Sequence, residues 1–315
     1  MKEYGGYFEL DTYRLPMLHE DAVALNCGRN CLAYLIKSRR ITKIKMPYFM
    51  CDCVFDICIK NGVEISYYHI DNHFIPIDVT LLDDEWLYVM NFYGQLSQKV
   101  IYSFLQNYKR IIVDNSQAYF EMPIDTVDTI YTCRKFFGVA DGAFLYTNSK
   151  VENSFPIDQS FERMRFVLGR FERTASEFYM ESSRNNELFE NEPIKYMSKL
   201  THNLLHGIDY VYVRKRRTDN YLLYHSRLDA INQLDVYSIQ GAFAYPLLVD
   251  NGVDIRKKLQ KKKIYIPTLW PNVVVSMPKD SLEYRFANNI LPLPCDQRYS
   301  KDDIEYILEV LLESV

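Results

Sequence analysis

A carboxylate and a lysine stand at the ends of two segments in the first half of the chain. Asp114 ends the apolar run 111–113, and Lys135 opens a segment rich in glycine and aromatic residues. In an open α/β sheet, ligands bind at the carboxyl ends of strands, so a polar residue there is a candidate for a site. Lysine serves as a Schiff-base residue because its ammonium loses its proton when it is desolvated. The competing interpretation is that Asp114 caps a loop and Lys135 is a surface charge.

The sequence around both residues follows the pattern of a known family. Asp114-Asn115-Ser116-Gln117-Ala118 resembles the Glu-Asp-x-x-Gln-Ala signature of the DegT/DnrJ/StrS sugar aminotransferases, which use pyridoxal 5'-phosphate (PLP) on fold type I. Lys135-Phe136-Phe137-Gly138 with the later Asp141-Gly142-Ala143 resembles their lysine loop and Gly-Gly strand. Weaker similarities lie in three other segments, namely 26–30, 91–94 and 291–294.

The resemblance implies a role for each residue of the two strong segments. Lys135 would hold PLP as an imine, and Asp114 would pair with the ring nitrogen. A carboxylate there keeps the nitrogen protonated and strengthens PLP as an electron sink. Gln117 would lie near the phenolic oxygen of the cofactor, where its amide N–H groups can donate. An ordinary turn amide is the alternative for Gln117.

The cofactor phosphate requires donors at the start of a helix. Gly28 stands directly before an expected helix, where a helix dipole and backbone N–H groups bind anions. We therefore expect Gly28, Arg29 and Asn30 to cradle the phosphate, with the Thr132 hydroxyl beside it and charge added by Arg134. A glycine at a helix start is also explained by capping alone.

The chain departs from the family pattern at several positions. It is shorter, Asn91 replaces the usual strand-end histidine, and Cys51 stands where the family has an aromatic residue that stacks on the pyridine ring. Phe49 or Phe92 would have to supply that ring, and we take Phe49 as the candidate cofactor contact. Aromatic residues at such positions are more often part of the core.

Strand and helix patterns alternate through the first half of the chain. Apolar runs predict strands at 44–49, 65–70, 87–92, 111–113 and 143–147. Helical spacing predicts helices at 30–39, 51–61 and 99–110 between them. The alternation favours an α/β fold with a mostly parallel mixed sheet, which is the large domain of a fold-type I PLP transferase on the resemblance.

The pattern changes after about residue 155. Long helical segments are expected at 161–179 and 194–205, then strands at 242–249 and 263–268 around a helix at 255–261, and a last helix at 301–312. We therefore predict a PLP-binding large domain at 1–155 and a helical connection with a smaller α+β domain at 156–315.

The bulk composition restricts the class of protein. The chain has 315 residues, of which 48% are hydrophobic and 25% charged, and its net charge is −4. This composition suits a globular protein and gives no electrostatic footprint for nucleic acid. No run approaches the roughly 18 apolar residues of a membrane helix. Seven cysteines without paired C-x-x-C spacing favour free thiols in a reducing cytoplasm and no metal site.

The resemblance implies a PLP-dependent aminotransferase that acts with an amino donor such as glutamate on a nucleotide-linked keto-sugar, in polysaccharide or glycan precursor biosynthesis. It also implies a homodimer, and we expect the enzyme in the cytoplasm without nucleic acid or membrane as partners. The alternative is a catalytically degenerate binding or scaffold subunit that keeps the fold and has lost the cofactor.

Overall fold

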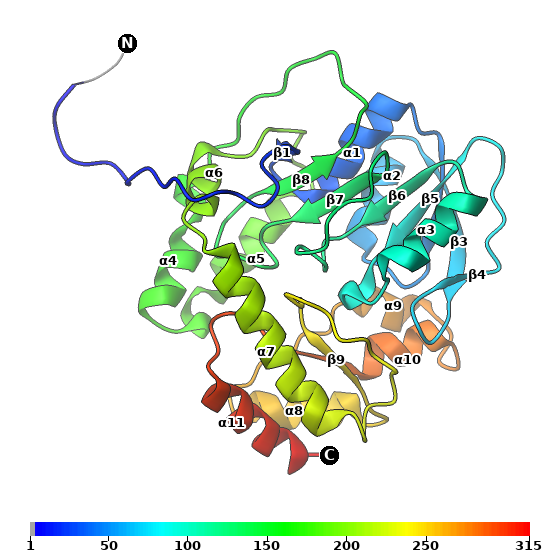
Figure 1. Ribbon diagram of the computed structural model, residues 1–315, viewed down its shortest axis with the longest axis vertical. Coiled ribbons are helices and arrows are strands. Elements are labelled where there is room, and N and C mark those ends of the chain that lie inside the picture. The colour runs from blue at the N-terminus through cyan, green and yellow to red at the C-terminus, as the bar shows by residue number, and fades with distance from the viewer. Residues whose placement is uncertain (1–3) are drawn as a thin grey trace.

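A computed structural model describes residues 4–315, and its centre is a mixed eight-stranded sheet in the order β1-β8-β7-β6-β5-β2-β3-β4 (Figure 1). Five adjacent strands are parallel to one another, namely β7, β6, β5, β2 and β3. At the edges, β8 is antiparallel to β7, β1 to β8, and β4 to β3. The strands are β1 Val23–Leu25, β2 Lys43–Pro47, β3 Glu64–Ile70, β4 Pro76–Ile77, β5 Glu85–Met90, β6 Ile111–Asp114, β7 Asp128–Thr132 and β8 Ala143–Tyr146. The predicted α/β class with a mostly parallel mixed sheet is confirmed.

Helices cover both faces of this sheet. The first three are α1 Gly28–Arg39, α2 Asp52–Lys60 and α3 Gln98–Asn107, close to their predicted ranges. Gly28 of α1 lies against the side chain of Ile130 on β7, whereas Ile101 of α3 lines a hollow with Val113 and Thr129. Because successive side chains of a strand point to opposite faces, α1 and α3 lie on opposite faces of the sheet.

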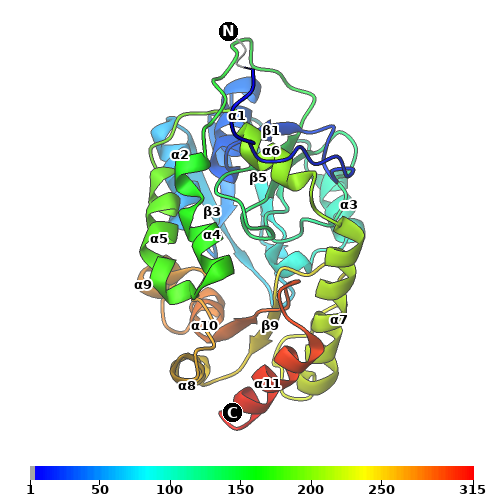
Figure 2. The same ribbon diagram turned by 90° about the vertical axis from the view of Figure 1, so that its left-hand side faces the viewer.

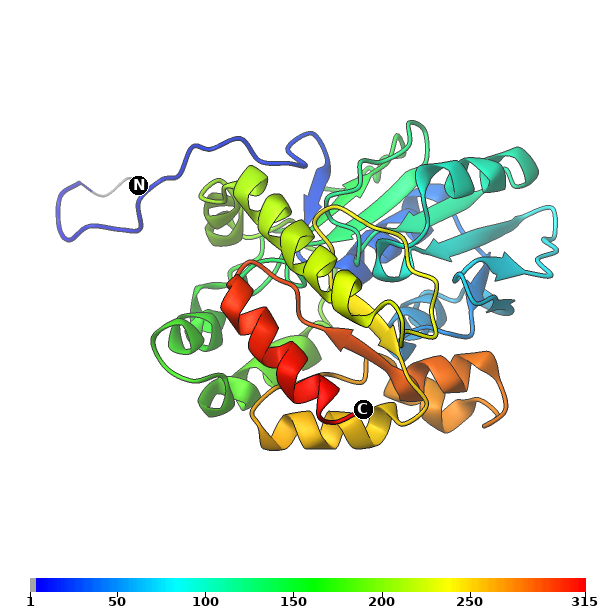
Figure 3. The same ribbon diagram turned by 60° about the horizontal axis from the view of Figure 1, so that its bottom comes forward.

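The second half of the chain adds helices and a small sheet. The two-stranded antiparallel sheet pairs β9 Tyr245–Leu248 with β10 Ile290–Leu293, and α7, α8 and α11 lie around it (Figure 3). The helices α4 and α5 lie side by side away from this small sheet (Figure 2). The helices are α4 Arg165–Glu172, α5 Tyr179–Leu188, α6 Lys199–Leu205, α7 Tyr210–Leu228, α8 Gly252–Lys261, α9 Pro271–Ser276, α10 Leu282–Asn289 and α11 Lys301–Leu312.

Three sequence predictions differ from the observed elements. The expected helix 161–179 is broken into the 3-10 turn Phe161–Arg163, α4, the 3-10 turn Ala175–Phe178 and α5. Residues 263–268 form no strand, and β10 is instead the partner of β9. Periodicity cannot reveal which segment supplies the partner of a strand, because pairing is decided by tertiary contacts. The strands β1, β4 and β7 were not predicted, since β1 and β4 are very short and β7 carries polar residues.

The N-terminal segment runs away from the sheet before the chain enters β1 (Figure 1). Its backbone meets the body through the bond from Leu15 N–H to His206 O, and its side chains Tyr7 and Phe8 are almost fully exposed. Among residues 4–315, no helix is both long and apolar enough to cross a membrane. The predicted domain boundary at residue 155 follows the last strand of the large sheet and stays a prediction.

Candidate active site

Asp114 is the last residue of β6 and lies opposite Ile130 of β7. Ile130 faces Gly28 at the start of α1, so the Asp114 carboxylate points to the face of the sheet that α1 covers. The side chain is buried, and both carboxylate oxygens accept hydrogen bonds. The Tyr88 hydroxyl donates to Oδ2 at 2.6 Å, and the backbone N–H of Ser116 donates to Oδ1 at 2.7 Å. These donors hold the carboxylate in one orientation.

Lys135 reaches the same turn from the next loop. Its Nζ donates to the Ser116 hydroxyl at 2.9 Å, and Ser116 in turn donates its backbone N–H to Asp114. The lysine loop is a tight turn in which Phe136 and Phe137 donate their N–H groups to Cys133 O. Ser116 therefore connects the two residues that the sequence singled out. Ser116 belongs to the motif at 114–118, but no feature of the sequence indicated that it would connect Lys135 with Asp114.

The surroundings of Lys135 lower the pKa of its ammonium. Burial by protein atoms is the main cause, and the negative charge of Asp114 acts in the opposite direction. The side chain nevertheless keeps contact with solvent. A ligand can therefore reach its Nζ. An ammonium with a lowered pKa yields the neutral amine more readily, as imine formation requires.

Gln117 connects the motif at 114–118 with the turn after β5. Its Oε1 accepts the backbone N–H of Tyr93 at 2.7 Å. Tyr93 has a positive φ of 54°, and Gly94 follows with a φ of 76°, so the turn is tight. Because the oxygen is engaged, the amide nitrogen of Gln117 is left to donate, and it has no hydrogen-bond partner within residues 4–315.

The start of α1 lies directly against Thr132. A Cβ built on Gly28 would stand 2.7 Å from the Cγ2 of Thr132, so no larger residue fits without a shift. The backbone N–H group of Gly28 has no partner among the described residues, whereas that of Arg29 interacts with the Cys27 thiol. Unpaired donors at a helix start attract an anion. Two predicted phosphate contacts, Gly28 and Thr132, are thus neighbours.

Asn30 does not fit the predicted role in the phosphate cradle. Its backbone N–H donates to Cys27 O at 3.1 Å, and its side-chain amide donates to Asn26 Oδ1 and Pro193 O, both at 2.8 Å. The residue is buried, and its donors are used within the protein. We correct the prediction: Asn30 fixes the start of α1 against the segment around Pro193.

Two arginines add positive charge beside this helix start. Arg134 donates to Asn186 Oδ1 at 2.7 Å, and Arg29 reaches Asn186 O at 3.4 Å. Neither arginine has an ion pair with a carboxylate within the described residues. Burial, followed by the charge of Arg29 and that of Arg163, lowers the pKa of Arg134 to about 10. Such mutual repulsion between cations is relieved by a bound anion.

Phe49 is not available as the ring that contacts the cofactor. Its side chain is fully buried in an aromatic cluster with Trp270, Phe92 and Phe286, at centroid distances of 4.3, 5.2 and 5.9 Å. A ring that is covered on all sides cannot stack on a ligand. We therefore correct this prediction too and assign Phe49 to the core, together with its alternative Phe92.

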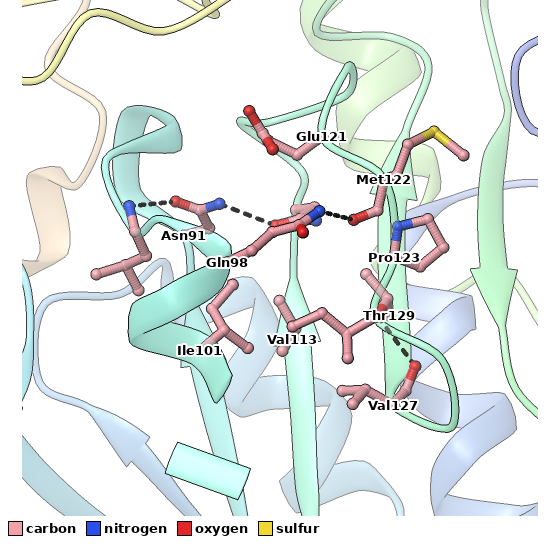
Figure 4. Close-up of a pocket in the computed structure, with 12 residues that line it drawn as sticks. Asn91, Gln98, Ile101, Val113, Glu121, Met122, Pro123, Val127 and Thr129 are labelled. Carbon is pink, nitrogen blue, oxygen red and sulfur yellow. Dashed lines mark hydrogen bonds between the residues drawn. The ribbon is translucent and has the colours of Figure 1, made fainter. Parts of the chain in front are cut away.

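A small hollow lies on the other face of the sheet. Asn91, Val113 and Thr129 line it with residues of α3 and of the loop 121–127 (Figure 4). Val113 precedes Asp114 in β6, so its side chain points away from the face that carries the Asp114 carboxylate. Asn91 itself donates to Asn115 Oδ1 and accepts from the N–H of Leu96. This hollow is separate from Lys135 and carries no part of the candidate site.

The residues present fit PLP at three of its groups. The free N–H group of Gly28, the Thr132 side chain and the two arginines suit a phosphate. The Asp114 carboxylate suits a protonated ring nitrogen, and Lys135 suits an aldehyde. The aromatic ring beside the lysine is that of the partly buried Phe243, whose centroid lies 5.8 Å from Lys135 Nζ. Within residues 4–315 there is also no cluster of three potential metal ligands.

Comparison with known proteins gives a likeness of fold. No sequence family matches the chain, and no curated protein matches it. Among solved structures, sugar aminotransferase CalS13 from Micromonospora echinospora is similar with a TM-score of 0.62 and 15% identity, over 93% of this chain and 87% of CalS13. NtdA from Bacillus subtilis, solved with bound cofactor PMP, gives 0.65 and 12% identity over 93% and 73% of the two chains.

A further similar structure carries the family name that the sequence suggested. A DegT DnrJ EryC1 StrS aminotransferase from Brucella abortus has a TM-score of 0.58 and 14% identity, over 93% of this chain and 85% of that one. The similarity extends across both the large sheet and the C-terminal elements. The chain therefore has the fold of the DegT/DnrJ/EryC1/StrS sugar aminotransferases.

Proposed function

We propose that this protein is a PLP-dependent aminotransferase that transfers an amino group from a donor such as glutamate to a nucleotide-linked keto-sugar, for polysaccharide or glycan precursor biosynthesis. The observation that carries the proposal is the connection from Lys135 through Ser116 to Asp114. It stands beside the start of α1, where Gly28 has a free backbone N–H group and Arg29 and Arg134 add positive charge. The substrate class is supported by the sugar aminotransferases that share the fold.

Each residue would have a distinct task. Bound PLP supplies an electron sink for the transfer. Lys135 Nζ, once neutral, would bind the cofactor aldehyde. It would then act as a general base that takes a proton from one carbon atom and returns it to another. Asp114 would hold a proton on the ring nitrogen, and Ser116 would orient Nζ. The amide nitrogen of Gln117 would donate to negative charge on the phenolic oxygen.

PLP binding tests this function directly. After gel filtration has removed free PLP, the purified protein should stay yellow, and borohydride followed by peptide mass spectrometry should place the cofactor on Lys135. Lys135→Ala should abolish the colour, whereas Lys99→Ala, on the exposed surface of α3, should leave it unchanged. Glutamate alone should release at most one equivalent of 2-oxoglutarate per bound PLP, and continued release should depend on an added nucleotide-linked keto-sugar. Absence of colour in the wild-type protein would refute the proposal.

We also propose a homodimer, and the exposed apolar residues support it. Tyr7 and Phe8 in the N-terminal segment are 98% and 101% exposed, and Phe171 on α4 is 91% exposed. Exposed large apolar side chains of this kind can be covered by a partner subunit. We place the enzyme in the reducing cytoplasm, in keeping with its seven free cysteines. Light scattering of the purified protein should give twice the chain mass.

A catalytically degenerate scaffold is the second candidate. It is favoured by the burial of Phe49, which removes the ring that was expected to contact the cofactor. A scaffold would dimerise and keep its stability when Lys135 is replaced, and it would bind no PLP. An aminotransferase would bind PLP with a stability gain that Lys135→Ala reduces. Thermal unfolding with and without PLP separates the two.

A further inference from the structure

Two cysteines meet at the start of α2. Cys51 is the residue before the helix and Cys53 is its second residue, and their Sγ atoms are 2.8 Å apart. Both side chains are only partly buried, so small molecules can reach them. The other five cysteines, Cys27, Cys31, Cys58, Cys133 and Cys295, are buried. The pair is thus the accessible thiol site among the described residues.

This pair lies beside the candidate active site. The hydrogen bond from Cys51 lowers the pKa of Cys53 to about 7, and the nearby positive charges of Arg29 and Lys135 act in the same direction against the effect of burial. Cys51 has a raised pKa, mainly because its hydrogen is shared with Cys53. Burial raises the pKa of each of the other five thiols. Since the thiolate is the reactive form, chemistry is expected at Cys53 first.

A metal ion is a poor fit for the pair. Structural zinc requires four ligands, and no group of three potential ligands exists within residues 4–315. Two adjacent thiols without further ligands are instead suited to thiol–disulfide exchange. An accessible thiol with a lowered pKa next to a second cysteine has the arrangement of redox-sensitive sites.

We propose that Cys51 and Cys53 form a redox-sensitive dithiol in the cofactor site, which a low-molecular-weight disulfide such as oxidised glutathione converts to an intramolecular disulfide and which bound PLP covers. The part concerning PLP rests on the proposed function. The site has Arg29 and Lys135 as neighbours, and both are assigned to cofactor binding. Oxidation and cofactor binding therefore compete for one place.

The exchange is balanced in atoms and electrons. The Cys53 thiolate attacks one sulfur of the glutathione disulfide, forms a mixed disulfide and releases a glutathione thiolate, which takes up a proton. Cys51 then loses its proton, attacks Cys53 Sγ and displaces the second glutathione. Two protein S–H bonds become one S–S bond, and the S–S bond of the oxidant becomes two S–H bonds. The protein is oxidised by two electrons and glutathione is reduced by two.

Intact mass spectrometry of the cofactor-free full chain tests the dithiol. Oxidised glutathione should remove two hydrogens and leave no glutathione attached, and peptide mapping should locate the bond between Cys51 and Cys53. Cys51→Ser should instead trap one glutathione on Cys53, and Cys53→Ser should slow the reaction. Cys58→Ala, a buried position on the same helix, should behave like the wild type. Modification spread over several cysteines, or no loss of hydrogens, would overturn the proposal.

A second arm tests the position in the cofactor site. PLP, whose binding is followed by its own colour, should slow the oxidation at least several-fold, and pre-oxidation should weaken PLP binding. If PLP binds and oxidation proceeds at the same rate, the placement is wrong. If PLP does not bind while the disulfide forms on Cys51 and Cys53, the proposed function fails and the dithiol stands.

Discussion

The hydroxyl of Tyr88 donates a hydrogen bond of 2.6 Å to Asp114 Oδ2, from the neighbouring strand and within the interior of the protein. Burial and the adjacent carboxylate raise the pKa of Tyr88 well above its ordinary value, so the phenol stays protonated and donates. A buried carboxylate is stable only when its oxygens are hydrogen-bonded. Tyr88 thus holds the carboxylate in the orientation in which it would meet the cofactor ring nitrogen.

Replacing Tyr88 by phenylalanine should destabilise the cofactor-free protein more than the PLP-bound one. Loss of a donor to a buried charge lowers the free energy of unfolding by roughly 1–3 kcal/mol. A protonated ring nitrogen would restore part of that loss. Urea unfolding with and without PLP measures both states. The matched control is Tyr68→Phe, which removes a bond to the neutral carbonyl of Tyr88 and should cost about 1 kcal/mol in either state.

A methyl group at residue 28 should disturb the phosphate cradle. In Gly28→Ala the new Cβ collides with Thr132 Cγ2, and such overpacking costs roughly 1–3 kcal/mol of stability and should weaken PLP binding. Thr132→Ser removes that methyl group and keeps the hydroxyl. The double variant should therefore bind PLP better than Gly28→Ala alone. Equal binding by the double and single variants would show that the contact is unimportant.

Removing the charge of Arg134 should affect the phosphate selectively. Arg134→Gln should raise the Kd for PLP about 10-fold, as expected when a charge-assisted bond is lost. Binding of pyridoxal, which lacks the phosphate, should not change. Arg40→Gln, just beyond the other end of α1, is the control and should leave both affinities alone. Equal losses for PLP and pyridoxal would place Arg134 outside the phosphate site.

The reactivity of Lys135 should begin at a lower pH than that of an ordinary lysine. Because burial lowers its pKa, the fraction of neutral amine rises earlier as the pH is raised. Competitive acylation of the cofactor-free protein, read by mass spectrometry against Lys99, gives the pH profile. Asp114→Asn removes the charge that raises the pKa, so the profile should move to lower pH still. A profile that matches Lys99 would contradict the lowered pKa.

Periodicity and short motifs in the sequence predicted part of the main sheet and singled out Asp114 and Lys135. The apolar runs that predicted β2, β3, β5, β6 and β8 reflect the contacts that strands make with the core. The helix at 301–312 was predicted with its bounds from its amphipathic spacing, and Ser300 and Asp303 form a capping box at its start. The motif at 114–118 and the lysine loop could likewise be recognised, because the residues of each are close together in the sequence.

Only the tertiary structure decided which side chains share a contact and which are covered. Tyr88 and Asp114 meet because β5 and β6 are neighbours in the sheet, an order that local spacing does not encode. Phe49 looked suited to a ligand and is buried, since three aromatic residues from distant segments close around it. A sequence determines the tendency of each segment by local interactions, but contacts between segments depend on the free energy of the whole packed chain.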